Sequence, residues 1–132
     1  MGTVANATFK NQSWDETPYP EREGEPKQTR VTQKKTFEGD IEGEGTVEYL
    51  MIYRTDGTAV FVGFEVVTGR IGDRSGTFVL QHSGSYEGGT AKASWHVVPG
   101  SGTGELEGLS GKGGFASAHA EEYPMTLEYE LA

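Results

Sequence analysis

Three side chains of this chain could carry acid–base chemistry together: Glu48, Glu65 and His82. Two carboxylates held opposite each other away from water repel, so one must hold a proton or a cation must stand between them. An imidazole titrates near neutral pH and could exchange a proton with such a pair. In a cavity, the three would form a general acid–base site or the polar end of a small-molecule pocket. The alternative is a buried ion and hydrogen-bond network that only fixes the register of the fold.

A cation near the two glutamates would let both carboxylates stay ionised. The candidates are Arg54, on the same predicted strand as Glu48, and Lys34 or Lys35 on the second predicted strand. A bound ligand is the remaining candidate. The pair therefore predicts either an ion pair or a ligand beside Glu65, since two ionised carboxylates cannot share a dry site at low cost.

The elements that must position these side chains are strands. Runs rich in Val, Thr, Tyr and Phe alternate with glycine-rich turns, and no window keeps an apolar period of 3.6 over three turns. Evenly spaced strands with tight turns predict an all-β fold, an eight-stranded antiparallel up-and-down β-barrel with a central cavity; a sandwich is the alternative. The expected strands span roughly 4–14, 28–38, 45–55, 58–69, 75–86, 90–99, 103–115 and 123–131.

The turn at Asp56-Gly57 sets the pairing of the third and fourth predicted strands. Asp-Gly is typical of a two-residue type I′ turn, which needs positive φ at both central positions. Closing the hairpin there places Glu48 directly opposite Glu65 and puts Arg54 on the same face. Paired residues share a face of a sheet, so both carboxylates are expected to point the same way.

Two further turns extend this face. Closing a hairpin at Gly72-Asp73 places Gly63 opposite His82, which brings the imidazole diagonally next to Glu65. Closing the next hairpin at Gly88-Gly89 places His82 opposite Trp95. Gly63 would leave room for a ligand atom or a water in front of the imidazole.

One face of these strands mixes large apolar side chains with glycine and alanine, as the interiors of small barrels do. We therefore expect this face to point inward and to line the cavity. The candidate cavity residues are Glu48, Glu65, His82, Trp95, Phe61, Tyr86 and Arg54.

The opposite face is polar on the fifth and sixth predicted strands but apolar on the third and fourth. A contiguous apolar patch on an outer surface usually marks a protein interface. We therefore expect a homo-oligomer, most simply a homodimer. The candidate interface residues are Tyr49, Met51, Tyr53, Val60, Val62, Phe64 and Val66.

Composition narrows the classes of function. The 132 residues hold 11 Lys and Arg against 20 Asp and Glu, a net charge of −9. This argues against nucleic acid or an anionic membrane as partner, because Lys and Arg supply that attraction. The absence of cysteine excludes a disulfide scaffold, a thiolate metal site and cysteine catalysis. Glu65, His82 and Glu48 are weak metal ligands as a set, so we expect neither a metal nor another cofactor.

The chain is expected to form one domain, residues 1–132, without a signal peptide or membrane span, and therefore to be cytoplasmic.

The segment 15–27 is rich in proline and acidic residues. Such a segment has little to bury, so it is expected to be a flexible loop.

Long stretches of the sequence resemble the domain of unknown function family 3224: ATFKNQSWDE at 7–16, GEGTVEYLMIYRTDGTAVFVGFEVVTG at 43–69 and RSGTFVLQHSGSYEGGTAKASWHVVPGSGTGELEGLSGKGGF at 74–115. That family is similar to the allene oxide cyclase barrel-like group, and SGTGELEGLSGKGGF at 101–115 also resembles the glycine-rich strand of allene oxide cyclases and plant dirigent proteins. The resemblance implies a lipocalin-like barrel with a central cavity. It carries over no catalytic residue.

Three functions follow from this sequence. The first is a barrel that binds a small hydrophobic or amphipathic molecule and acts on it as an isomerase or cyclase, where a shaped cavity enforces one reactive conformer. The second is a carrier of such a ligand without turnover. The third is a non-catalytic structural or interaction protein with a filled barrel, which the volume of the cavity would separate from the other two.

Overall fold

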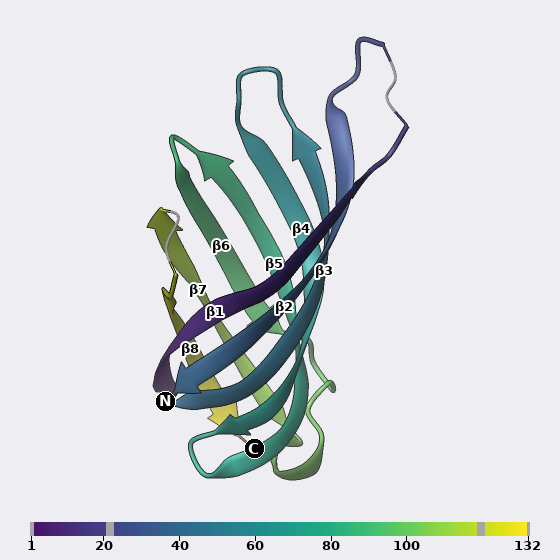
Figure 1. The fold of residues 1–132 in the computed structure, drawn as a ribbon. Helices are drawn as coiled ribbons and strands as arrows, with labels where there is room; N and C mark the ends of the chain where they lie inside the picture. The colour runs from purple at the N-terminus through teal and green to yellow at the C-terminus, as the bar shows by residue number, and fades with distance from the viewer. Residues whose placement is uncertain (1, 21–22, 119–120, 132) are drawn as a thin grey trace.

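Eight antiparallel strands form one closed barrel in chain order, from β1 to β8 and back to β1 (Figure 1). The computed structural model describes residues 2–20, 23–118 and 121–131. β1 begins and β8 ends at the lower end of Figure 1, and the turns after β1, β3 and β5 lie at the upper end. The strands are β1 (Thr3–Pro18), β2 (Lys27–Gly39), β3 (Ile41–Tyr53), β4 (Ala59–Ile71), β5 (Arg74–Glu87), β6 (Thr90–Val97), β7 (Leu109–Ala118) and β8 (Tyr123–Leu131).

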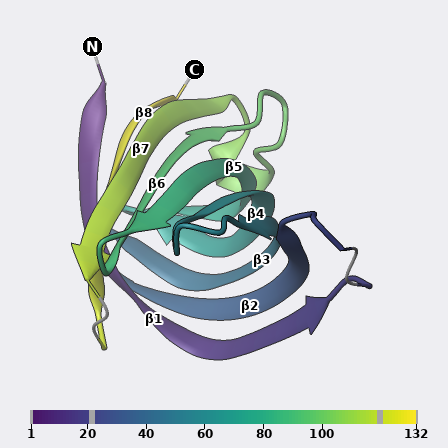
Figure 2. The ribbon, with the colours of Figure 1, turned by 90° about the horizontal axis from the view of Figure 1, so that it is seen from above.

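The core lies inside the barrel because side chains alternate between the two faces of each strand. On β2, the side chains of Val31, Gln33, Lys35 and Phe37 are buried, while Lys34 between them is exposed. Seen from above, the strands curve around this interior (Figure 2). The predicted all-β, eight-stranded antiparallel barrel is confirmed.

The β3–β4 turn is longer than the sequence predicted, and this moves β3 by one residue. The amide of Arg54 donates to the carbonyl of Thr58 at 2.8 Å, and the amide of Gly57 donates back to Arg54 at 3.3 Å. Gly57 has φ +89°, the left-handed residue that follows the turn in a three-residue hairpin loop. The Asp56 carboxylate accepts from the Thr58 amide at 3.0 Å and closes the loop.

The longer loop pairs Tyr53 with Ala59 and Val47 with Glu65. A shift of one residue exchanges the two faces of a strand. The predicted opposition of Glu48 and Glu65 is therefore wrong, since Glu48 pairs with Phe64 on the outer face. The registers predicted from the other two turns are confirmed, with Gly63 opposite His82 and His82 opposite Trp95.

Two other boundaries differ from the predicted ones. β1 continues to Pro18 and pairs with β2 there, so the predicted loop at 15–27 is too long at its start. The seventh strand begins at Leu109 rather than at 103, because Gly104–Leu106 form the short 3₁₀ helix η1. The buried side chain of Leu106 and the bond from the Thr103 amide to the Thr77 carbonyl, 2.8 Å, fasten this segment onto β5.

Candidate ligand-binding site

Two predicted cavity residues lie outside the barrel. Glu48 is exposed and forms an ion pair with Arg30 of β2, with 3.0 Å between Nη2 and Oε1. Arg54 is exposed in the β3–β4 turn, where its guanidinium contacts Thr58. Both predictions of an inward side chain are wrong, and the cause is the one-residue shift of β3.

A buried cluster of three ionisable side chains, Lys35, Glu65 and His82, occupies the middle of the barrel. Glu65 Oε1 lies 2.8 Å from His82 Nε2 and 3.6 Å from Lys35 Nζ. All three residues are at most 2% exposed. The cation beside Glu65 is thus Lys35, one of the predicted candidates, and it replaces the second glutamate as the partner.

The charges of the cluster follow from its geometry. Burial of Lys35 and Glu65 disfavours their charged forms, but the attraction between the two charges has the larger effect. The pKa of Lys35 is therefore raised. The pKa of Glu65 is lowered by Lys35 and by the hydrogen bond from His82. Burial lowers the pKa of His82, against the opposing effect of Glu65. At neutral pH the cluster therefore holds a charged Lys–Glu pair and a neutral imidazole that donates from Nε2 to the carboxylate.

Glycines make room for this cluster. A side chain at Gly45 would overlap the Oε2 atom of Glu65. A side chain at Gly63 would overlap the carbonyl oxygen of Glu48, and its Cβ would come within 2.9 Å of the Tyr49 ring. The space predicted in front of His82 is therefore taken by the Tyr49 ring and the backbone of β3, and the Tyr49 and His82 rings meet edge to face at 5.6 Å.

Three buried polar atoms have no hydrogen-bond partner among the residues that the structure describes: Glu65 Oε2, His82 Nδ1 and Trp95 Nε1. The His82 and Trp95 rings are neighbours, with centroids 5.0 Å apart. Buried polar groups usually bind a protein group or an internal water. Trp95 and the cluster thus leave one donor and two acceptor atoms that an internal water would satisfy.

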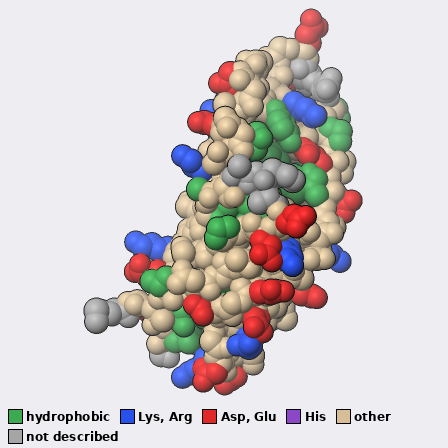
Figure 3. Space-filling model, turned by 60° about the vertical axis from the view of Figure 1, so that its left-hand side comes forward, with side chains coloured by type: hydrophobic (Ala, Val, Ile, Leu, Met, Phe, Trp, Pro, Cys, Tyr) green, Lys and Arg blue, Asp and Glu red, His purple; other side chains and the backbone are tan. Residues whose placement is uncertain are grey.

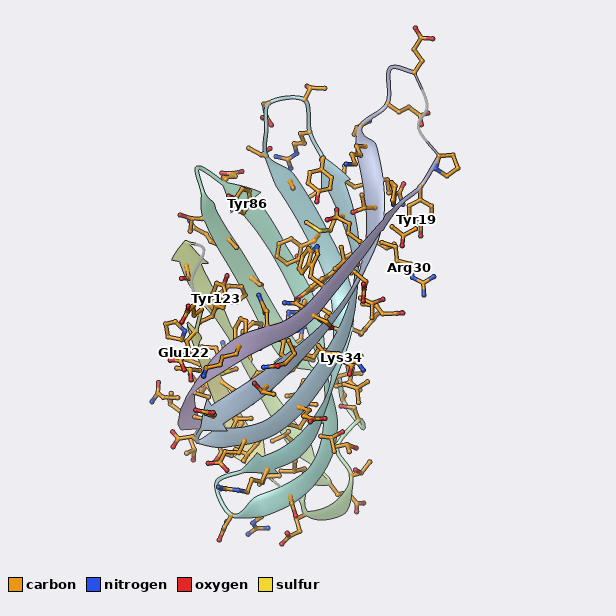
Figure 4. The ribbon with its side chains drawn as sticks, viewed as in Figure 1. Tyr19, Arg30, Lys34, Tyr86, Glu122 and Tyr123 are labelled. Atoms are coloured by element: carbon orange, nitrogen blue, oxygen red, sulfur yellow. The ribbon has the colours of Figure 1, made fainter. Side chains whose placement is uncertain are left out.

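A pocket of about 640 Å³ occupies the upper half of the barrel, with Lys35 and Tyr49 among its walls. Tyr86, near the upper end of the barrel (Figure 4), lines it together with Gly57 of the β3–β4 turn and Ala91 of β6. Glu65, His82 and Trp95 are not among the lining residues. The pocket is lined by Phe9, Asn11, Trp14, Gln33, Lys35, Tyr49, Met51, Tyr53, Gly57, Ala59, Phe61, Tyr86, Ala91, Phe115 and Tyr123.

The walls of the pocket are largely aromatic. Phe9 stacks on Tyr123 at 5.0 Å and meets Phe115 edge to face at 5.1 Å. The Lys35 ammonium lies 4.4 Å from the centre of the Phe9 ring, a cation–π contact that suits a desolvated charge. On the face drawn in Figure 3, hydrophobic side chains gather in the upper half, while carboxylates are spread across the surface.

The end of β1 forms one rim of this pocket. Glu16 accepts hydrogen bonds from Thr29 at 2.7 Å, from Trp14 at 3.2 Å and from the hydroxyl of Tyr53. Partial burial and the Glu16 carboxylate raise the pKa of Tyr53 to about 12. Lys27 lies 5.3 Å from the Tyr53 ring centre. The segment predicted to start a flexible loop thus holds two pocket residues, Trp14 and Tyr53, in place.

The sequence predicted part of this pocket. Phe61 and Tyr86 line it, while Glu65, His82 and Trp95 are buried beneath it. Whether any of these residues binds a ligand stays a prediction. Lys35 was predicted only as a candidate cation, and Tyr49, Met51 and Tyr53 were predicted on the outer face. The lining residues without any prediction come mainly from the terminal strands and β2, where no predicted turn sets the register: Phe9, Asn11, Trp14, Gln33, Phe115 and Tyr123.

Only part of the predicted outer patch lies on the outer face of the barrel. Tyr49 and Met51 are buried and line the pocket with Tyr53, so their assignment to an outer interface is wrong. On β4 the assignment to the outer face is correct, and the exposed fractions of Val62 and Phe64 are 54% and 56%. Leu50 and Ile52 of β3 lie beside them in the observed register. This β3–β4 patch consists of Leu50, Ile52, Val60, Val62, Phe64 and Val66.

No group of three or more His, Asp or Glu side chains that could hold a metal occurs within residues 2–20, 23–118 and 121–131. Glu48 is too far outside to complete a set with Glu65 and His82, which are both inside. Nor does any helix in this described part of the chain have the length and apolar character needed to cross a membrane.

The fold and site define a closed antiparallel β-barrel with a charged Lys–Glu–His cluster beneath an aromatic pocket. Residues 5–129 match the profile of the DUF3224 family, described as "Protein of unknown function", and the chain belongs to this family. No curated protein matches the chain.

A solved structure supports the same assignment. It is the crystal structure, at 1.84 Å resolution, of a protein with unknown function from the DUF3224 family of Shewanella oneidensis MR-1. The two chains are 29% identical and superpose with a TM-score of 0.81, over 100% of this chain and 99% of the other.

Proposed function

We propose that this barrel binds a small amphipathic molecule in its upper pocket. The observation that carries the proposal is a pocket of about 640 Å³ with aromatic walls and a buried lysine. Ligand pockets have volumes of about 300–1,000 Å³, mostly apolar walls and a few convergent polar groups. Aromatic rings would hold the apolar part of the ligand, and Lys35 and Tyr49 would hold its polar end.

The competing function, a filled barrel without a ligand, is supported only by the lower half. There the side chains of Ile41, Ile71, Phe78 and Leu106 are almost completely buried and pack together. The upper half contains the pocket instead, with partly exposed Tyr53 and Tyr86 at its edge. A barrel that served only as a structural unit would gain stability from filling this space, since burial of apolar side chains stabilises a fold.

A neutral fluorescent probe tests the proposal. N-phenyl-1-naphthylamine should bind with a rise and a blue shift of its emission. The variant Ala91→Trp fills the rim and should weaken binding roughly tenfold, the equivalent of about 1.4 kcal/mol. Ser94→Trp makes a similar addition on the exposed outer face of the same strand and should leave the affinity unchanged. Absence of binding, or equal loss in both variants, would contradict a ligand in the pocket.

An isomerase or cyclase activity, the narrower function implied by the allene oxide cyclase-like resemblance, stays a prediction. Two groups in the pocket suit it. The Lys35 ammonium and the Tyr49 phenol could both donate to an oxyanion that develops on a substrate, which is the usual electrostatic contribution to such reactions. Burial raises the pKa of Tyr49, so the phenol keeps its proton at neutral pH.

The β3–β4 patch supports a separate proposal, a homodimer. The patch is free of charge, whereas the chain as a whole carries −9 and would repel a second copy elsewhere. An isologous dimer uses the same patch on both subunits, so this apolar patch, with the mutually neutralised Arg30–Glu48 pair at its edge, is enough. Light scattering should give twice the chain mass of 14.3 kDa. Phe64→Lys should give the monomer, and Ser94→Lys on the outer face of β6 should not. A monomeric wild type would end this proposal.

A further inference from the structure

Lys35 is the only charged side chain among the described residues that line the pocket. The chain has nearly twice as many acidic as basic residues, yet no Asp or Glu is among the described lining residues, and the nearest rim carboxylate, Glu16, is already bound by Trp14, Thr29 and Tyr53. The one charged group in the described pocket wall is therefore a cation, balanced by Glu65 outside the wall, in a protein of net charge −9.

The polar groups near Lys35 include a donor, the Tyr49 hydroxyl. Lys35 and Tyr49 lie close enough for each to shift the pKa of the other, and the phenol can accept from the ammonium while its O–H donates to a guest. The amide of Gln33 donates to the side-chain oxygen of Asn11, so this acceptor in the wall is already used. A guest with acceptor oxygens fits these groups, and an ammonium guest would meet a like charge.

The ion pair with Glu65 leaves Lys35 able to take a second acceptor. The distance from Nζ to Glu65 Oε1 is 3.6 Å, longer than a charge-assisted hydrogen bond of about 2.7–2.9 Å, and the same oxygen receives the short bond from His82. Lys35 has three N–H donors. Lys35 lines the pocket and Glu65 does not, so a guest that reaches the ammonium would approach it from the side opposite the carboxylate.

We propose that the pocket selects an amphipathic monocarboxylate, whose carboxylate binds Lys35 and the Tyr49 hydroxyl and whose ring or chain lies among Phe9, Phe61 and Phe115. This inference rests on the proposed binding function and gives it a ligand class. The aromatic walls accept the apolar part of the guest, and the single cation sets the orientation of its head.

Three probes with one biphenyl body separate the head groups: biphenyl-4-carboxylate, biphenyl-4-carboxamide and biphenyl-4-methylamine. In calorimetric titrations of the full chain at pH 7, the carboxylate should bind roughly 10- to 100-fold more tightly than the amide, the range of a hydrogen bond to a charged group. The amine should bind more weakly still. Equal affinities for carboxylate and amide, or tighter binding of the amine, would overturn the inference.

Variants assign the preference to its residues. Tyr49→Phe should lower the affinity for the carboxylate several-fold and leave that for the amine unchanged. Lys35→Met should abolish the difference between carboxylate and amide, while Lys34→Met, the same change on the exposed face of β2 (Figure 4), should keep it. Lys35→Met leaves Glu65 unpaired and could prevent folding. The double variant Lys35→Met with Glu65→Gln has no unpaired charge, so it allows the same binding comparison in a folded protein. A carboxylate preference that survives in the double variant would place the head group elsewhere.

The two proposals fail in different ways. If the neutral naphthylamine probe and all three biphenyls fail to bind, the pocket is not a binding site and the proposed function is wrong. If the neutral probe binds and the carboxylate has no advantage, the pocket binds ligands but Lys35 does not select them.

Discussion

Lys35→Met is expected to lower the free energy of unfolding by about 3–5 kcal/mol, the usual effect of removing one partner from a buried ion pair. Glu65 is 1% exposed, and after the change only the neutral His82 would donate to it. Lys34→Met deletes the same charge from the outer face of the same strand and should change stability by less than about 0.5 kcal/mol. Urea titrations of the three proteins at pH 7 measure the difference.

The double variant Lys35→Met with Glu65→Gln should recover most of this loss. A buried ion pair contributes little net stability once desolvation is counted, so neutralising both partners together is often nearly neutral. Glu65→Gln alone should be destabilising too, because the Lys35 ammonium would lose its counter-charge. If the double variant loses as much free energy of unfolding as the two single variants together, Lys35 and Glu65 do not act as a pair, and the cluster described above is wrong.

The register of most of the barrel could be predicted from turn chemistry, because a hairpin loop of known length fixes every pair that follows. Gly72-Asp73 and Gly88-Gly89 placed His82 beside Gly63 and Trp95 correctly. Asp56-Gly57 failed because Asp-Gly also occurs where a β-turn is followed by one left-handed glycine, and Gly57 takes that role. The difference is one residue, but it turned Glu48 outward and Tyr49 inward.

The lysine beside Glu65 could be found from the sequence only as one of several candidates. The alternation of Val31, Gln33, Lys35 and Phe37 puts Lys35 on the same face as two apolar residues, and this favours Lys35 over Lys34. This preference for Lys35 can be inferred from the sequence of β2 alone. The proximity of Lys35 to Glu65 cannot, because it depends on the register of β2 against β3: Lys35 pairs with Gly45, and the missing side chain of Gly45 lets Glu65 of β4 reach across β3.

The last expectation concerns acid. The wild-type protein should lose stability as the pH falls below about 6.5, the ordinary pKa of histidine. Burial lowers the pKa of His82 in the native state, and Lys35 acts in the same direction against the hydrogen bond to Glu65. The unfolded chain then takes up a proton near pH 6.5 that the native protein takes up only at a lower pH, so unfolding is favoured in this window.

His82→Gln tests this contribution, since the amide can still donate to Glu65 but does not titrate. Each proton bound only by the unfolded chain costs up to about 1.4 kcal/mol of stability per pH unit. The wild type should therefore lose more stability than His82→Gln between pH 7 and pH 5.5 in urea titrations. Below the ordinary pKa of 4.5 both proteins should lose stability further, because Lys35 holds the pKa of Glu65 down against its burial. Equal losses between pH 7 and pH 5.5 would mean that His82 binds its proton as readily in the native barrel as in the unfolded chain, and that the imidazole beneath the pocket is not held neutral.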